Sequence, residues 1–448
     1  MPLNIIIVGG SLSALMHAIP LHRAGHKVHI LEQTPTATLP SHLAGICLGP
    51  DMLSFLDCFD LAKDIPLGSL STQIQSLDAD GTKRPFLKGD RIMTSWDALY
   101  FRLRMNFDGV GKDYVASRGM VATPGQSGEV ARQRAVYETG KRVVDIKDNI
   151  HDGDGDGEGG GRISLVVQDI LSPDRDRTYP LSADMVLGAD GPSSTVRSIF
   201  LGDTVQRKYT GYVVWRGVVP ESLVSKETRR IFEANVTQSS LGAQGGHVIV
   251  YNIPNSTGSI TPGTRLLNIA WYTNISPSSL PTLLTDKNGM KHHTSIPPNL
   301  LKPALWSAQL AHARTVLPPP YLEILTQIKS PFMHTITDYV SSHASFLSGR
   351  VLLVGDALAL LRPHVALSTN TAAFEALLTE KLVRGDISVS EWEERVIERV
   401  ESEWAWSVWV GEWLLRPRGL WGVLVCGAWY WGRWGVRWVR GLFGLRTI

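Results

Sequence analysis

The first forty residues alternate between apolar runs and small polar turns. Residues 4–8 form a continuous apolar run, which is typical of a strand buried on both faces. A Gly-Gly-Ser turn follows, and apolar residues then recur at helical spacing until about Gly25. A second apolar run, residues 27–31, ends at Glu32. The pattern predicts a βαβ unit, in which Pro20 is expected to kink or shorten the helix.

Similar patterns predict the rest of the fold. Helices are expected over residues 94–107, after 191 and through 374–382, and strands over 135–147, 162–169, 184–188 and 351–354. Between about 205 and 335 the chain is rich in Val, Tyr and Trp separated by Ser-, Pro- and Gly-rich loops, which predicts a mostly antiparallel sheet. The expected fold class is therefore α/β, with a Rossmann-like domain and an inserted, mostly antiparallel β-sheet domain.

These elements suggest domain boundaries. The Rossmann-like domain is expected to be discontinuous, over residues 1–90, 91–205 and 340–395, and the inserted substrate-binding sheet is expected over 206–339. The acidic, glycine-rich stretch 151–161 cannot bury apolar surface, so it is predicted to be a disordered loop. A Trp- and Arg-rich tail occupies 400–448.

Composition narrows the functional classes. The 448 residues include 44 basic and 42 acidic side chains. This near balance means that net charge gives no argument for nucleic-acid binding. Three cysteines form neither a disulfide framework nor a spaced metal site, which favours a reducing compartment such as the cytoplasm. Nothing in the sequence fixes an oligomeric state.

The tail has two interpretations. Nine of the fourteen tryptophans lie between Trp404 and Trp438, and the apolar run 419–432 is flanked by arginines. That run is shorter than the roughly 20 residues needed to span a bilayer. Tryptophan and arginine favour the membrane surface, so peripheral membrane contact through residues 404–448 is one expectation. A helical tail that packs on the Rossmann-like domain is the other.

The first turn has the chemistry of a phosphate-binding site. It reads Gly9-Gly10-Ser11 and continues to Ala14, where small residues would let backbone amides approach a pyrophosphate at the helix end. Glu32 lies 23 residues after Gly9, where an acid could accept hydrogen bonds from ribose hydroxyls. This combination favours dinucleotide binding over a purely structural turn.

Two later turns carry an acid at the end of a strand. Asp190 lies in the Gly188–Gly191 turn, where it could cap the following helix or support a site made elsewhere. Gly355-Asp356 follows the strand 351–354 and precedes a helix, an arrangement that can hold a nucleotide-like ligand. An ordinary strand-turn-helix unit with a solvated Asp is the alternative.

Three segments occur in an order that resembles the FAD-dependent aromatic hydroxylases, the single-component flavoprotein monooxygenases. They are GGSLSALM with Glu32, GADGPSSTVR at 188–197, and GRVLLVGDALALLRPH at 349–364 followed by STN at 368–370. TSWDALYFRLR at 94–104 and GYVVWRGVV at 211–219 are similar to the 2,6-dihydroxypyridine hydroxylase-like branch. The resemblance covers roughly residues 3 to 390.

The resemblance implies a glutathione-reductase-type FAD domain and an inserted substrate domain. It assigns Gly9, Gly10, Ser11, Ala14 and Glu32 to the ADP half of FAD. Gly355 and Asp356 would bind the ribityl chain or pyrophosphate, Asp190 is associated with FAD and NAD(P)H use, and Ser368, Thr369 and Asn370 would lie along the isoalloxazine. Arg104 could reach the phosphates or be solvated. The chain departs from the family pattern at Ala359, where many members have His, and at Ala366 and Ser368, where they have Gly.

The implied function is an FAD-dependent monooxygenase that uses NAD(P)H and O2 to hydroxylate an aromatic or phenolic small molecule, as in secondary metabolism. Pro363 would shape the loop beside the flavin. His364 could deprotonate a phenol, although packing with a backbone partner is preferred, and Arg216 is an active-site candidate only as the less favoured alternative to a sheet residue. Epoxidation of a lipophilic isoprenoid and flavin binding without turnover remain alternatives.

Overall fold

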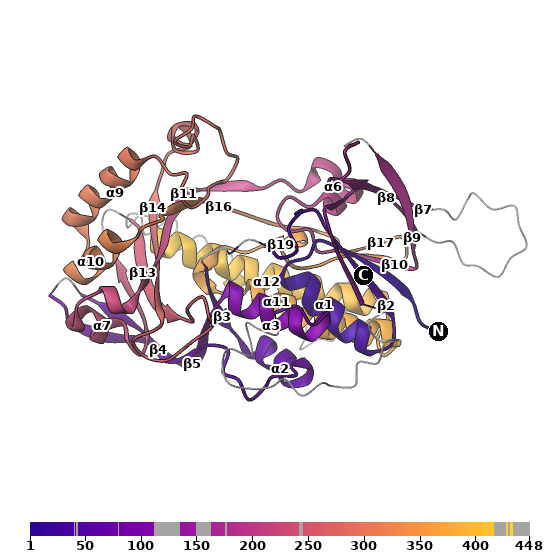
Figure 1. Cartoon of the computed structure of the whole chain (residues 1–448), viewed down its shortest axis with the longest axis horizontal. Helices are drawn as coiled ribbons and strands as arrows, with labels where there is room; N and C mark the ends of the chain where they lie inside the picture. The colour runs from indigo at the N-terminus through magenta and orange to yellow at the C-terminus, as the bar shows by residue number, and fades with distance from the viewer. Residues whose placement is uncertain are drawn as a thin grey trace, which may run out of the picture.

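A computed structural model of the chain describes all residues except 40, 42, 43, 79, 112–134, 149–162, 175, 176, 242–244, 416–426, 429, 430 and 433–448. The predicted loop 151–161 therefore lies outside the described residues. The described chain forms two lobes, with helices α9 and α10 on one and sheet β7–β9 on the other (Figure 1). The α/β fold class is confirmed.

The first lobe is built on a six-stranded, mostly parallel sheet. Its strands are ordered β17 (Ser345–Phe346), β18 (Val351–Leu353), β10 (Met185–Gly188), β1 (Asn4–Val8), β2 (Lys27–Glu32) and β6 (Ala135–Thr139). Only the edge strand β17 is antiparallel to its neighbour. The carboxyl ends of β1, β2, β10 and β18 therefore meet at one edge of the sheet, which is where open α/β sheets bind ligands.

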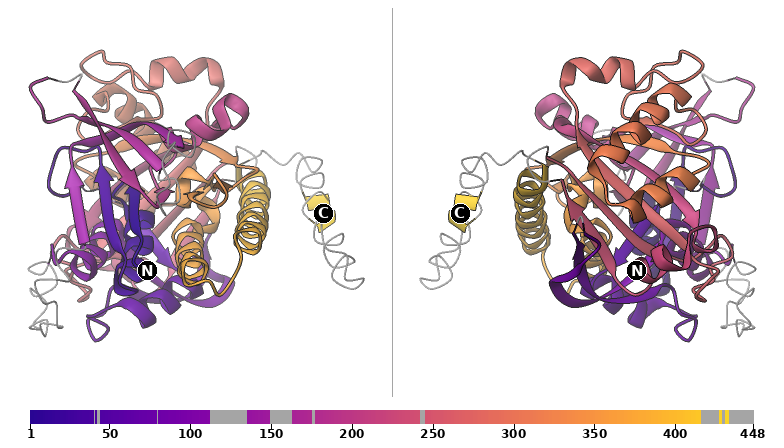
Figure 2. Two further views of the ribbon diagram at one scale, coloured as in Figure 1. Left: turned by 90° about the vertical axis from the view of Figure 1, so that its right-hand side faces the viewer. Right: turned by 90° about the vertical axis from the view of Figure 1, so that its left-hand side faces the viewer.

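Helices and a small second sheet cover this parallel sheet. Helix α1 (Leu12–Arg23) packs between α3 (Trp96–Phe107) and α11 (Ser368–Arg384), and α12 (Val389–Leu415) lies against α11 (Figure 2). Helix α2 (Pro50–Phe59) also contacts α11. The antiparallel sheet of β7 (Lys141–Asp148), β8 (Ile163–Asp169) and β9 (Thr178–Ala183) shares the core with β1 and β2. Pro20 lies in the last turn of α1, and the helix continues past it to Arg23, so the proline does not end the helix.

The second lobe is a ten-stranded sheet. Its main path runs β15 (Ser295–Ile296), β16 (Phe332–Val340), β11 (Lys208–Pro220), β14 (Leu266–Asn274), β13 (His247–Ile253), β12 (Val236–Ser240), β4 (Ser69–Leu77), β5 (Lys83–Ser95) and β3 (Gly45–Leu48), and β19 (Ala359–Leu360) pairs with β16. Neighbours on this path are antiparallel, apart from the parallel pair β12–β4.

One face of the large sheet buries an apolar core against helices that the sequence pattern did not predict. Trp215, Ile269 and Trp271 share this core with residues of α7 (Lys226–Phe232), α9 (Pro303–Val316) and α10 (Pro319–Gln327). The prediction of strands and loops alone over 205–335 was therefore incomplete. The opposite sheet face, with Arg216 and His334, is left to face the first lobe.

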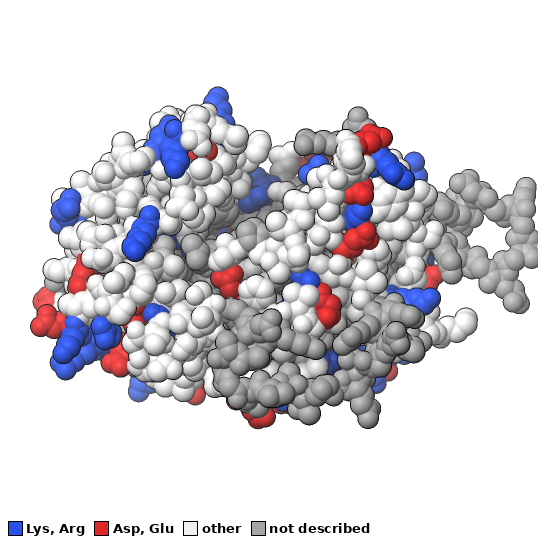
Figure 3. Space-filling view, viewed as in Figure 1, with Lys and Arg blue, Asp and Glu red and all other residues white. Residues whose placement is uncertain are grey.

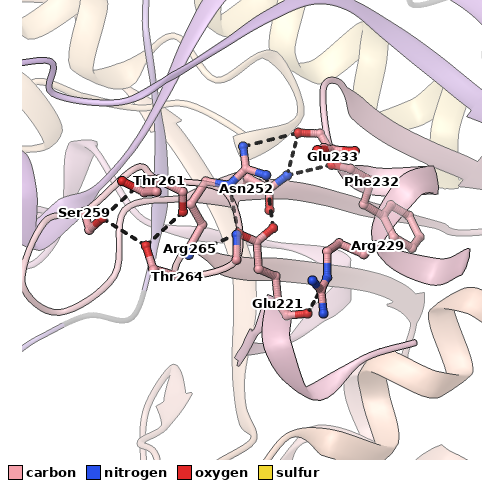
Figure 4. A network of polar contacts seen from close by, with 10 residues as sticks. Glu221, Arg229, Phe232, Glu233, Asn252, Ser259, Thr261, Thr264 and Arg265 are labelled. Carbon is pink, nitrogen blue, oxygen red and sulfur yellow. Dashed lines mark hydrogen bonds and ion pairs between the residues drawn. The ribbon is translucent and has the colours of Figure 1, made fainter. Parts of the chain in front are cut away.

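A buried ion pair fixes the end of β11 beside β14. The Glu221 carboxylate accepts hydrogen bonds from the Arg265 guanidinium at 3.1 and 3.0 Å and from the Gly263 amide (Figure 4). Arg265 also donates to the Glu233 carbonyl, and both charged side chains are almost fully enclosed. Removal of either partner would leave an uncompensated buried charge, which is destabilising. The pair therefore holds the end of β11 beside the start of β14 only while both residues are present.

The observed boundaries differ from the predicted ones at two places. Residues 45–48, 69–77 and 83–95 belong to the large sheet, although the prediction placed 1–90 and 91–205 in the Rossmann-like domain. The parallel pairing of β4 with β12 joins them to that sheet. Helix α12 also continues across the boundary predicted between 395 and 400.

Candidate active site

A cavity of about 930 Å³ lies between the edge of the parallel sheet and the inner face of the large sheet. Its wall includes Gly9, Glu32, Asp190 and Asp356, which lie at or just after the ends of strands far apart in sequence, and Arg216 from the interior of β11. The surface is hollowed between the two lobes, and basic side chains lie in the hollow (Figure 3). The sequence-predicted motifs are thus brought together at one site.

The glycine turn allows the backbone to approach a ligand closely. Gly9 has φ +96°, and a Cβ there would lie 2.5 Å from the Ala189 carbonyl oxygen. A Cβ on Gly10 would lie 2.2 Å from the Tyr137 hydroxyl, which donates to the Gly10 carbonyl at 2.8 Å. Both positions therefore require glycine, and Ser11 leads into the amino terminus of α1, whose unpaired amides attract phosphate.

Glu32 ends β2 beside this turn. Its carboxylate accepts hydrogen bonds from the Gly10 amide at 2.7 Å and the Thr34 amide at 2.7 Å. Each carboxylate oxygen keeps a further lone pair, and the residue lines the cavity. Glu32 can therefore hold the turn and still accept from ribose hydroxyls. Ala14 is fully buried and permits the close contact of α1 with the sheet.

Asp190 combines the two roles that its motif suggested. Its carboxylate accepts from the Ser194 hydroxyl at 2.5 Å and the Thr195 amide at 2.7 Å, so it caps the start of α6 (Thr195–Leu201), and it also lines the cavity. Burial raises the pKa of this carboxyl. Arg197 does not pair with Asp190 but donates to Tyr339 and the Ala357 carbonyl, which ties this turn to the Asp356 turn.

Asp356 follows β18 in a short helical turn (Gly355–Ala357). Burial raises the pKa of Asp356 to about 6, although Arg207 acts in the opposite direction. Within the described chain its carboxylate has no hydrogen-bond donor, so it remains available to hydroxyls of a ligand in the cavity. Behind it, the carboxyl group of the buried Glu375 on α11 accepts from the Gly355 amide at 2.6 Å and holds the turn.

The start of α11 places three predicted residues in two environments. Ser368 and Thr369 line the cavity at the helix amino terminus. Asn370 is buried, and its side chain binds the amides of Asp51 and Met52 at 2.8 and 3.2 Å. Asn370 therefore joins α11 to α2 and is absent from the cavity wall. Ala366, just before the helix, has φ +53°, the conformation that glycine adopts most easily.

The observed wall fits the shape and chemistry of FAD. A glycine cradle and a helix amino terminus suit its pyrophosphate, Glu32 suits the adenosine ribose, and the unpartnered Asp356 carboxylate suits the ribityl hydroxyls. The buried Ser13 hydroxyl has no hydrogen-bond partner among the described residues and also lines the cavity, so it offers one more group for a ligand. These groups would hold the cofactor without a change of fold.

Arg104 does not reach this cavity. Its guanidinium is buried, donates to Asp108 at 2.9 and 2.7 Å and to the Tyr100 hydroxyl at 2.7 Å, and lies 3.7 Å from the Tyr137 ring centroid. The side chain is absent from the cavity wall and already makes four hydrogen bonds, so the structure does not support the expectation that it binds flavin phosphates, and its burial does not support the solvated alternative. It acts behind the glycine turn by holding the tyrosine that contacts Gly10.

Pro363 and His364 lie beside the cavity and are absent from its wall. Pro363 is exposed at the start of a helical turn, Pro363–Val365. His364 packs among Tyr212, His247 and Tyr272, and its Nε2 is 2.9 Å from the Tyr212 hydroxyl. Burial lowers the pKa of His364 well below its usual value, and its Nδ1 has no hydrogen-bond partner. This environment favours the packing interpretation, with a tyrosine rather than a backbone group as the partner.

Arg216 is the predicted residue that the structure places on the substrate side of the cavity. Its guanidinium carbon lies 5.7 Å from the Phe332 ring centroid, and its buried Nε has no hydrogen-bond partner in the part of the chain that the structure describes. Sequence reasoning missed its neighbours in the wall, which are Arg207, Ser295, Phe332 and His334. Strand register could not be read from the sequence, so nothing indicated which side chains of β16 share a face with Arg216.

The start of the Trp-rich tail packs on the protein. Residues 404–415 are part of α12, where Ser407 and Glu412 contact Arg362 and the Leu415 carbonyl accepts from Asn274. This agrees with the packing alternative for those residues, whereas most of 416–448 lies outside the described chain. None of the described helices is long and apolar enough to cross a membrane.

Comparisons with known proteins agree with this geometry. A family model described as FAD binding domain-like matches residues 209–338. The chain is 28% identical over 408 residues to 2,6-dihydroxypyridine 3-monooxygenase of Paenarthrobacter nicotinovorans, covering 88% of this chain and 87% of that protein. The solved 2,6-dihydroxypyridine-3-hydroxylase of Arthrobacter nicotinovorans superposes with a TM-score of 0.73 at 25% identity over 92% of each chain. HpxO of Klebsiella pneumoniae, solved with FAD and uric acid, shares the fold, with a TM-score of 0.63 at 16% identity over 96% of this chain and 92% of that one.

The fold, the cofactor cradle and these likenesses define an FAD-dependent oxidoreductase. Within that class, the chain is similar to the FAD-dependent aromatic hydroxylases, the single-component flavoprotein monooxygenases, and among them to the 2,6-dihydroxypyridine hydroxylases. It uses FAD as cofactor, with NAD(P)H and O2 as co-substrates.

Proposed function

We propose that FAD occupies the cavity along Gly9, Glu32 and Asp356, and that an aromatic or phenolic small molecule is hydroxylated against the inner face of the large sheet. The observation that supports this most strongly is the convergence of four strand ends and two helix amino termini on one cavity. That convergence suits a long, phosphate-containing cofactor.

Each part of the wall has a role in this proposal. When bound, FAD accepts electrons from NAD(P)H and activates O2. Asp356 and Glu32 bind cofactor hydroxyls, and the amino end of α11 stabilises negative charge near Ser368 and Thr369. Phe332 lines the substrate side of the cavity, where it excludes water and can stack on a flat ring.

The charge of the substrate side favours a polar aromatic ligand over an isoprenoid. Arg207, Arg216 and His334 all line that part of the wall. A lipophilic substrate would remove water from these groups without supplying negative charge, which is unfavourable. No separate nicotinamide domain is needed if NAD(P)H enters the same hollow.

Purification tests the function directly. The protein should be yellow, and a polar aromatic substrate should accelerate NAD(P)H oxidation and yield a product with one more oxygen. Asp356→Ala should remain folded but lose most of its FAD, because it removes a carboxylate that faces the cavity. Asp386→Ala is the matched control, because that residue is exposed and pairs with Arg384 at 3.2 Å. A colourless protein that FAD cannot reconstitute would exclude the flavoenzyme, and full flavin content in Asp356→Ala would exclude the role of Asp356.

We also propose that the carboxyl-terminal tail contacts an anionic membrane surface. Phe86 and Trp413 stack at 5.8 Å and are 48% and 45% exposed, close to the end of α12. The neighbouring positions Lys83 and Lys88 on β5 are exposed and add positive charge, whereas Arg84 is paired with Asp78 at 2.7 Å.

A chain that ends at Leu415 tests this proposal and keeps α12 intact. Full-length protein should sediment with phosphatidylserine-containing vesicles, and the shortened chain should largely remain in the supernatant. Vesicles of neutral lipid are the control. Equal sedimentation of the two chains would show that residues 416–448 are not the contact.

A further inference from the structure

A much smaller cavity lies behind the cofactor cavity. Its volume is about 10 Å³, roughly the minimum that holds one water molecule. Gly355, Asp356 and Ser368 line both cavities, so the small one lies directly against the cofactor site. Thr371 and Glu375, one helical turn apart on α11, complete the polar part of its wall.

Buried polar atoms around this cavity need a hydrogen-bond partner. Glu375 Oε2 accepts from the Gly355 amide at 2.6 Å, but the fully enclosed Oε1 has no partner among the described residues. The Asp356 carboxylate also has no donor within the described chain. Because buried polar groups without a protein partner are usually satisfied by bound water, one water molecule here can join Glu375, Asp356 and Thr371.

Hydrogen bonds continue from the small cavity to the surface. The Thr371 hydroxyl is bonded to one oxygen of the Glu403 carboxyl group on α12, and the other oxygen is bonded to Arg399. Arg399 donates to Asp51 at 2.7 Å, and these two side chains are 32% and 28% exposed. Glu403 therefore lies one hydrogen bond behind a solvent-exposed ion pair.

The acids of this chain can hold protons near neutral pH. Burial and the nearby Glu403 and Asp356 raise the pKa of Glu375 to about 8, whereas the Gly355 amide and Arg399 act in the opposite direction. Burial also raises the pKa of Glu403. A protonated Glu375 can donate from its free oxygen to a water molecule in the cavity.

We propose that the small cavity holds one water molecule and that this water, with Thr371 and Glu403, carries protons from solvent to Asp356 in the cofactor cavity. A proton on Glu403 moves to the Thr371 hydroxyl as the hydroxyl proton moves to the water. The water then passes a proton to Asp356, so each new O–H bond forms as another breaks. Glu375, bonded to the same water, stores a proton beside the path.

The use of this path depends on the proposed function. Each turnover would combine the substrate, O2, NAD(P)H and one proton to give the hydroxylated product, NAD(P)+ and water. A cavity filled by cofactor and substrate excludes bulk water, so that proton needs a route through the protein.

Two measurements on the yellow holoenzyme test the path without turnover. A crystal structure should show an ordered water between Glu375 and Asp356, and a small cavity without ordered water would overturn the proposal. Infrared spectroscopy detects the C=O band of the protonated Glu375 carboxyl group, which Glu375→Gln should remove. After transfer into D2O this band shifts as deuterium replaces the proton.

Thr371→Val should slow that exchange about ten-fold or more, because it removes the hydroxyl that relays the proton. Thr371→Ser, which keeps the hydroxyl, should exchange at nearly the wild-type rate. Thr326→Val, at an exposed threonine on α10, is the matched control and should exchange like the wild type.

A purely structural role for Thr371 predicts a different result. If Thr371 only holds α12 against α11, Thr371→Val will lower thermal stability and leave the exchange rate unchanged, which would overturn the proposal. A yellow protein with the ordered water and slowed exchange in Thr371→Val, but without hydroxylation of any aromatic compound, would support the path and exclude only the function proposed above.

Discussion

Gly10 shows how one residue sets the cofactor site, because nothing larger fits between Tyr137 and Glu32. We expect Gly10→Ala to lose most bound FAD, since the new methyl group must displace the Tyr137 hydroxyl or the glycine turn that faces the pyrophosphate. Flavin absorbance per protein after gel filtration measures this. Gly432→Ala is the control, because a Cβ there meets no atom of the described residues within 4 Å.

Retained flavin in Gly10→Ala would mean that Tyr137 and the turn adjust without cost.

Single residues also show the limits of sequence reasoning. Asp356 and Glu32 were predictable because each ends an apolar strand, whereas Arg104 was misassigned because partners such as Asp108 and Tyr137 became evident only with the fold. His334 carried no sequence signal at all.

Helix α11 connects the cofactor turn to a buried acid, so its packing should depend on pH. Burial and the nearby Glu403 and Asp356 raise the pKa of Glu375 to about 8. A carboxyl with a raised folded-state pKa is stabilising while it is protonated. Its contribution is complete below about pH 4.5 and is lost as the pH rises toward 8. We expect cofactor-free protein to lose up to about 1.4 kcal/mol per pH unit in that window through this group.

Urea unfolding at about pH 5 and about pH 8 checks this expectation. Glu375→Gln keeps a carbonyl oxygen for the Gly355 amide but cannot ionise, so its stability should change less with pH than that of the wild type. Glu380→Gln, on the same helix and paired with Arg384 at 3.6 Å, is the control. The same pH slope in the wild type and Glu375→Gln would show that Glu375 does not carry it.

At the scale of the whole molecule, the sequence predicted local units better than long-range pairing. The βαβ unit, the Asp190 turn and helix α11 each have a local signature of apolar period and turn residues, and the structure confirms them. The membership of β3, β4 and β5 in the large sheet depends on contacts with strands more than a hundred residues away, for which no local pattern exists. The substrate side of the cavity could not be predicted either, because its side chains are brought together by the register of β11, β15 and β16, which no local sequence pattern encodes.

The parallel pairing of β4 with β12 has a consequence for biosynthesis. Strand β4 ends at Leu77, and its partner begins at Val236, so the ribosome makes β4 long before the strand that covers its edge. During that interval the nascent β4–β5 hairpin has an open edge, and exposed strand edges pair readily with other chains. The apolar residues Phe86 and Leu87 on that hairpin increase the hazard. Yield in a foreign host should therefore depend on translation speed between these two strands and on chaperone supply more than on the stability of the finished enzyme.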